Sequence, residues 1–128
     1  MNNTSSININ SQSIGSQSNA VRSIEDFPLW TALVTPFLEN NHIDFTSLKN
    51  IATAQAQAGN ALLLLGSTGE GLALTNAEQL SIVEFVCGLQ LNVPIMVAVG
   101  SYNLPEQVNW IQQCNEFNID CFLLGTPV

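Results

Sequence analysis

The residues of this chain best suited to chemistry form a short glycine-rich segment, GSTGEG, at positions 66–71. Its glycines let the backbone approach a ligand closely, and the hydroxyls of Ser67 and Thr68, with the adjacent N–H groups, can hold a small anion such as a carboxylate. The segment is not a Walker A loop, and its glycine spacing differs from the GxGxxG of dinucleotide-binding proteins. A plain turn whose hydroxyls only cap the next helix is the alternative.

The composition excludes several other kinds of function. Ten acidic residues and two basic ones give a net charge of −8, and the two cations, Arg22 and Lys49, cannot form the basic surface that nucleic acids or anionic membranes attract. The single histidine, His42, and three cysteines without a CxxC pair predict no metal site and reduced thiols. Because neither a membrane-length apolar run nor a secretory signal is visible, we expect a cytoplasmic protein. We expect no cofactor.

The elements that must position the glycine-rich segment follow an alternating pattern. Four apolar runs each predict a buried strand: residues 29–37, 61–65, 95–99 and 121–124. Three helices are expected between them, opening at Asp44, at Thr75 with Glu78 in capping-box spacing, and near Pro105. In the last helix, Val108, Ile111 and Cys114 are expected to share one face.

This order, β-α-β-α-β-α-β, predicts a parallel sheet with helices outside, as in both a doubly wound sheet and a (β/α)8 barrel. In a barrel the functional residues lie at the carboxyl ends of the strands, here Thr35-Pro36, Gly66–Glu70, Gly100–Tyr102 and Thr126-Pro127. Residues 1–26 include a Ser/Asn/Gln tract at 1–20 and predict a disordered extension, which leaves one domain at 27–128.

Several segments, taken in order, resemble the dihydrodipicolinate synthase/N-acetylneuraminate lyase family. They are TALVTPF, LLLLGSTGEGLALTNAEQ, VPIMVAVGS and the final GTPV. The resemblance covers about residues 29–128. It implies the first half of a (β/α)8 barrel and the Schiff-base chemistry of a class I aldolase.

The same resemblance implies roles for individual residues. Ser67 would join a proton relay with a tyrosine, and Ser67 and Thr68 with the nearby N–H groups would bind the carboxylate of pyruvate. Gly66, Gly69 and Glu70 would support the loop, Glu70 through hydrogen bonds that its carboxylate accepts.

Three further positions depart from the family or match it only in part. Gly71 stands where many synthases have serine, and Tyr102 is only a candidate for the rim of the site. Thr126-Pro127 resembles a family turn, but Val128 takes the place of the first of its two aromatic residues.

The Schiff-base lysine of the family projects from the sixth strand, which lies beyond Val128. Lys49 cannot replace it, because the sequence places Lys49 on the first outer helix among polar neighbours. We therefore expect the 128-residue chain to be inactive on its own, as part of a barrel that normally needs about 250 residues.

The activity that the resemblance implies is that of a 4-hydroxy-tetrahydrodipicolinate synthase, which condenses pyruvate with aspartate semialdehyde in lysine and diaminopimelate biosynthesis. The segments LALTNAEQ and VPIMVAVGS favour the synthase branch. The alternative within the family is a lyase for N-acetylneuraminate or a 2-keto-3-deoxy sugar acid. An inactive remnant or interaction module is the alternative of another class. Full-length family members are expected to form homo-oligomers.

Overall fold

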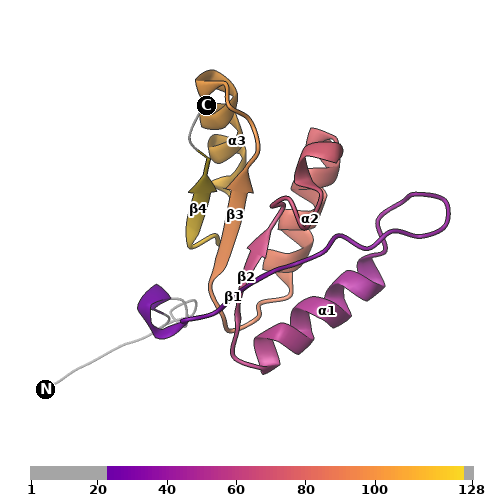
Figure 1. Cartoon of the computed structure of the whole chain (residues 1–128), viewed down its shortest axis with the longest axis vertical. Coiled ribbons are helices and arrows are strands. Elements are labelled where there is room, and N and C mark those ends of the chain that lie inside the picture. Colours follow the sequence, from indigo (N-terminus) through magenta and orange to yellow (C-terminus); the bar gives the residue numbers. More distant parts are fainter. Residues whose placement is uncertain (1–22, 126–128) are drawn as a thin grey trace, which may run out of the picture.

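The structure, a computed structural model, describes residues 23–125. Its centre is a sheet of four parallel strands: β1 (Trp30–Ala32), β2 (Ala61–Leu64), β3 (Ile95–Val99) and β4 (Cys121–Leu124). The strands lie side by side in chain order, as Figure 1 shows by their colours. A doubly wound sheet reverses its strand order at a switch point, whereas a barrel adds each strand next to the previous one. The observed order is that of a barrel.

Three helices join the strands: α1 (Phe45–Gln57), α2 (Asn76–Gly88) and α3 (Leu104–Cys114). They cover one face of the sheet, and burial along β3 shows which one, because Ile95, Val97 and Val99 are buried while Met96 and Ala98 are partly exposed. The helices contribute these buried side chains to the core: Leu48, Ala52, Ile82, Val83, Val86, Trp110 and Cys114. In residues 23–125 no helix is both long and apolar enough to cross a membrane.

The predicted helix starts are confirmed. Asp44 caps α1, because its carboxylate accepts hydrogen bonds from the N–H of Ser47 at 3.0 Å and from the Ser47 hydroxyl at 2.7 Å. Thr75 and Glu78 form the predicted capping box at the start of α2. These caps satisfy N–H groups that a helix leaves without partners in its first turn, so each helix begins at a defined residue.

The first strand is shorter and less buried than predicted. The run 29–37 forms a ladder only over Trp30–Ala32, with one further bond from the N–H of Leu33 to the carbonyl of Leu63 at 3.0 Å. Pro36 has no N–H to continue the ladder, and Phe37 instead pairs with Ile43 in an isolated antiparallel bridge. The chain therefore leaves the sheet after Leu33 and turns back toward α1.

The buried face of α3 also differs from the prediction. Trp110 and Cys114 are buried, whereas Val108 is 45% exposed. Trp110 lies one helical turn before Cys114, and its Nε1 donates to the carbonyl of Ala98 at 3.3 Å. The size of the indole, together with this bond to β3, decides which face of α3 packs on the sheet.

The face of the sheet opposite the helices has no cover among the described elements. The strand register aligns Ala32, Leu63, Met96 and Cys121 in one row across all four strands. Each of these side chains is at least partly exposed. In a closed barrel such a row would point into the interior.

The termini fall partly outside the described residues. Ile24–Asp26 form a short 3-10 turn capped by Ser23, inside the extension predicted at 1–26. The predictions for the tract 1–20 and for Thr126-Pro127 and Val128 concern residues that the structure does not describe. The domain boundary after residue 26 stays a prediction.

Candidate functional site

The glycine-rich loop (Gly66–Gly71) directly follows β2, at the carboxyl edge of the sheet where barrel enzymes place their sites. Leu65, the residue after β2, has a left-handed backbone conformation, φ 64°, and the chain leaves the sheet there. Ser67 and Thr68 are exposed at the tip of the loop, and Gly69 is buried beneath them. The two residues predicted to bind a carboxylate thus lie together and face solvent.

The loop closes on itself in a way that leaves donors available. The N–H of Glu70 donates to the carbonyl of Ser67 at 3.0 Å, and the N–H of Gly71 donates to the carbonyl of Gly66 at 3.1 Å. Within residues 23–125, the N–H groups of positions 67–69 and the hydroxyls of positions 67 and 68 make no hydrogen bond. Successive N–H groups without partners in a turn can form a concave site for an anion.

Thr35, which follows β1 in the chain, holds this loop by a hydrogen bond. The hydroxyl of Thr35 donates to the carbonyl of Gly69 at 2.6 Å, and Thr35 is the one buried polar side chain in the described part of the chain, 6% exposed. A Cβ at Gly69 would lie 2.8 Å from the carbonyl oxygen of Leu33, so only glycine allows this close approach. The two consecutive βα units are therefore joined directly under the candidate site.

The structure gives a reason for glycine at position 71. A Cβ there would overlap the carbonyl oxygen of Leu65, which the left-handed conformation of Leu65 directs at it. The carbonyl of Gly71 accepts a hydrogen bond from Nε2 of Gln79 at 2.6 Å, which ties the end of the loop to α2. Any side chain at 71 would require Leu65 to adopt another conformation.

The residues predicted to support the loop differ in what they do. Gly69 meets a steric requirement, whereas a Cβ at Gly66 would make only an ordinary contact, 3.6 Å from Leu63. Glu70 is exposed, with φ 57°, and its carboxylate accepts no hydrogen bond from residues 23–125. The bonds expected of Glu70 are thus not seen there, and Thr35, predicted at a functional strand end but not as a support of the loop, supplies support instead.

The remaining candidates lie on other parts of the fold. Lys49 is exposed on α1, as predicted. Tyr102 is 64% exposed after β3, and its ring lies beside Gly125, 3.6 Å from where a Cβ of that residue would be. The Tyr102 ring thus lies next to the residue that follows β4.

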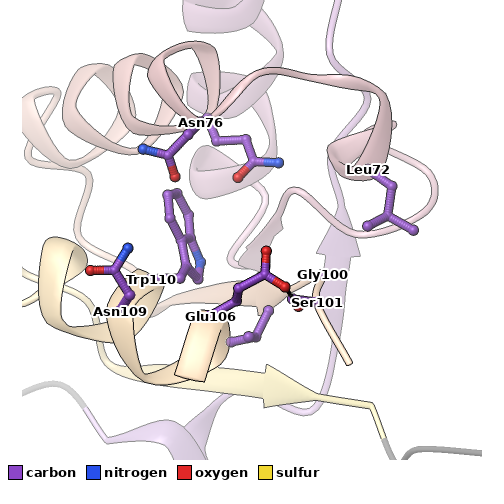
Figure 2. A pocket seen from close by; sticks show the side chains of 9 residues that line it. Leu72, Asn76, Gly100, Ser101, Glu106, Asn109 and Trp110 are labelled. Carbon is purple, nitrogen blue, oxygen red and sulfur yellow. Dashed lines mark hydrogen bonds between the residues drawn. The ribbon is translucent and has the colours of Figure 1, made fainter. Parts of the chain in front are cut away.

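A separate cavity of about 390 Å³ lies between α2, the end of β3 and α3 (Figure 2). Its lining consists of Leu72, Asn76, Gln79, Val99, Gly100, Ser101, Glu106, Asn109 and Trp110. Figure 2 shows Asn76 on α2 above Trp110 on α3, and the Glu106 carboxylate accepts from the Ser101 hydroxyl at 3.0 Å. Gly100 and Ser101, which the sequence predicted at a functional strand end, line this cavity, whereas no residue of the glycine-rich loop does. The sequence signal that could have indicated this cavity is the polar residues in the first turns of α2 and α3, such as Asn76 and Glu106.

Other chemistry has little support among the described residues. Across residues 23–125 no three His, Cys, Asp or Glu side chains gather as they would to hold a metal ion. Burial raises the pKa of the Cys114 thiol to about 11, with a smaller effect from nearby Cys87. Cys114 is therefore protonated at neutral pH and is not a nucleophile.

Parallel strands in chain order, helices on one face and a glycine-rich loop at the carboxyl edge define part of a (β/α)8 barrel. The chain belongs to the dihydrodipicolinate synthetase family, whose model matches residues 28–128. The 4-hydroxy-tetrahydrodipicolinate synthase of Francisella philomiragia is 49% identical over 100 residues, which cover 78% of this chain and 34% of that protein.

Solved structures agree with the fold. The dihydrodipicolinate synthase from Aquifex aeolicus superposes with a TM-score of 0.70 and 28% identity, over 75% of this chain and 33% of that one. The N-acetylneuraminate lyase of Proteus mirabilis gives a TM-score of 0.69 at 19% identity over similar shares, 75% and 33%, and so shows the fold alone. The chain spans about a third of the length of the curated relatives that it matches.

Proposed function

We propose that this chain provides the pyruvate-binding loop of a class I, Schiff-base-forming lyase of the 4-hydroxy-tetrahydrodipicolinate synthase type. The observation that carries the proposal is the set of unused hydrogen-bond donors on the loop. It combines two exposed hydroxyls, of Ser67 and Thr68, with three N–H groups that no acceptor in residues 23–125 uses. The names of the curated relatives support the synthase reaction, in which pyruvate condenses with aspartate semialdehyde.

In this proposal Thr68 and the neighbouring N–H groups bind the pyruvate carboxylate. Binding the carboxylate fixes the position of the adjacent carbonyl carbon and favours negative charge that develops next to it. The Ser67 hydroxyl can donate and accept a proton at once, as a relay with a tyrosine requires. These roles come from the family resemblance together with the exposure of both side chains.

The lysine that this chemistry needs has no counterpart in these 128 residues. In a class I lyase, a neutral lysine amine attacks the ketone carbon of pyruvate, and loss of water leaves an imine. Lys49 is the sole lysine of the chain, and it lies exposed on the outer helix α1 rather than in a strand or in the glycine-rich loop. We therefore infer that the chain alone forms no imine, and that the lysine belongs to sequence this chain does not contain.

The test measures pyruvate binding and imine formation separately. Titrating the ¹⁵N-labelled chain with pyruvate should shift the amide signals of positions 67–69. The variant Thr68→Val should weaken that response, and Thr46→Val, an exposed threonine on α1, should leave it unchanged. Borohydride treatment with pyruvate should give no mass adduct; an adduct on Lys49 would contradict the inference about the lysine.

The alternatives give other outcomes. A lyase for N-acetylneuraminate or a 2-keto-3-deoxy sugar acid would also bind pyruvate at this loop, so its distinguishing property is a sugar aldehyde as the second substrate. A folded chain whose loop amides do not respond to pyruvate would favour a non-catalytic interaction module. A cytoplasmic location and homo-oligomeric assembly belong to the same proposal and rest on the family.

A further inference from the structure

We propose that Thr35 is a positioning residue for the glycine-rich loop, acting through Gly69 and Glu70 on the amide of Thr68. The inference rests on the proposed function, in which that amide binds the pyruvate carboxylate. Thr35 touches no substrate in this arrangement. Its effect is to set the direction of the Thr68 N–H, which does contact the substrate.

Thr35 is itself fixed on both sides. Two residues earlier, the N–H of Leu33 donates to the carbonyl of Leu63 at 3.0 Å, which holds the chain to β2. One residue later, the carbonyl of Pro36 accepts from the N–H of Asp44 at 2.9 Å, which holds it to the start of α1. The Thr35 side chain is thus presented from a segment anchored to the sheet and to a helix.

The Thr35 hydroxyl then fixes one peptide unit of the loop. It donates to the carbonyl of Gly69 at 2.6 Å, within the range of a good O–H···O bond. The other end of the same peptide unit, the N–H of Glu70, donates to the carbonyl of Ser67 at 3.0 Å. Held at both ends, the peptide cannot turn over, and this sustains the left-handed φ of 57° at Glu70, which is uncommon outside glycine.

The hydrogen bond from Glu70 to Ser67 connects the peptide unit that Thr35 holds with the N–H of Thr68. The carbonyl of Ser67 belongs to the same planar peptide unit as the N–H of Thr68. Because the Glu70 N–H holds that carbonyl, it also sets the direction of the Thr68 N–H. Two peptide planes therefore connect the buried hydroxyl of Thr35 to the exposed donor.

Without the hydroxyl, the carbonyl of Gly69 would lose its donor in a buried position. A buried carbonyl without a partner is unfavourable, so the peptide would turn toward water and release the bond from Glu70 to Ser67. The loop would then sample several conformations, of which only some direct the Thr68 N–H toward a carboxylate.

The chain offers a matched set of variants. Thr35→Val keeps the shape and removes the hydroxyl, Thr35→Ser keeps the hydroxyl, and Thr31→Val is the control. Thr31 lies on β1, four residues before Thr35, but its hydroxyl donates to Oε1 of Gln55 on α1 at 2.8 Å. The pyruvate dissociation constant, read from the Thr68 amide shift, should rise roughly three- to tenfold in Thr35→Val. It should change less than about twofold in Thr35→Ser and Thr31→Val.

Amide hydrogen exchange without pyruvate tests the positioning independently of the proposed function. Exchange at Glu70 should accelerate in Thr35→Val and not in Thr31→Val. If pyruvate does not shift the Thr68 amide signal of the wild type, the proposed function is wrong. The exchange rate of the Glu70 amide still decides whether Thr35 positions the loop. Unchanged affinity and unchanged Glu70 exchange in Thr35→Val overturn the inference. Should Thr35→Val not fold, a Glu70 amide that exchanges as fast as that of Ser67 in the wild type overturns it equally.

Discussion

Asp120 and Ile95 exchange two hydrogen bonds at the start of the β3–β4 pair. The N–H of Asp120 donates to the carbonyl of Ile95 at 2.9 Å, and Oδ2 of Asp120 accepts from the N–H of Ile95 at 2.8 Å. This reciprocal pair places Asp120 where it sets the register in which Met96 aligns with Cys121. The Asp120 side chain thus adds one hydrogen bond between the starts of β3 and β4.

Replacing Asp120 by alanine should therefore destabilise the chain. The N–H of Ile95 would lose a charged acceptor in a partly buried place, which costs about 1–3 kcal/mol of unfolding free energy. Urea unfolding followed by tryptophan fluorescence measures the loss. Asp120→Asn keeps an acceptor oxygen and should recover part of it, and equal losses in the two variants would contradict this explanation.

Two glycines should respond oppositely to alanine. At Gly69 a methyl group would meet the carbonyl oxygen of Leu33, and the expected destabilisation is about 1–3 kcal/mol. At Gly88, in the last turn of α2, nothing lies within 4 Å of the added methyl. Gly88→Ala should be neutral or stabilise by up to about 1 kcal/mol, because alanine favours the helix. Thermal unfolding of both variants tests the contrast.

Acid should weaken the start of α1. Hydrogen bonds from the Ser47 hydroxyl and N–H hold the pKa of Asp44 below its ordinary 3.8. Because the folded pKa is the lower one, the stabilisation is present above pH 3.8 and is lost as the pH falls through the folded value. The Ser47 amide signal should titrate with a midpoint below 3.8. In Asp44→Asn, which caps without ionising, that titration should disappear.

High pH should destabilise the folded chain because of the buried Cys114 thiol. Burial raises the pKa of its thiol from 9.0 to about 11, so the unfolded chain ionises first as the pH rises. Stability is therefore full below pH 9 and declines between pH 9 and 11. Urea midpoints measured across this range should fall, and the fall should be smaller in Cys114→Ala. At pH 8, a thiol reagent should modify partly exposed Cys121 well before Cys114.

The sequence predicted the features that depend on neighbouring residues. The caps at Asp44 and Thr75 and the strand at 95–99 were all predicted, because spacing and residue type determine them locally. Strand order, which separates a barrel from a doubly wound sheet, could not be read from the pattern, because both begin with the same alternation.

The features that sequence reasoning missed depend on contacts between distant residues. The bond from Thr35 to Gly69 spans 34 positions, and no local pattern marks a threonine as the support of a loop in the next βα unit. The choice of Trp110 over Val108 for the buried face likewise follows from the space between α3 and β3. Pro36 was visible in the sequence, yet its effect on the length of β1 depended on where Phe37 found a partner.

The uncovered row formed by Ala32, Leu63, Met96 and Cys121 also governs how the chain behaves at high concentration. An open apolar sheet face favours association, whereas the eight excess negative charges keep separate molecules apart at neutral pH. Acidification toward the isoelectric point near 4.1 removes that repulsion while the apolar face stays the same. The colloidal stability of the chain is thus electrostatic, and precipitation should set in on approach to pH 4.1 or when salt screens the charge.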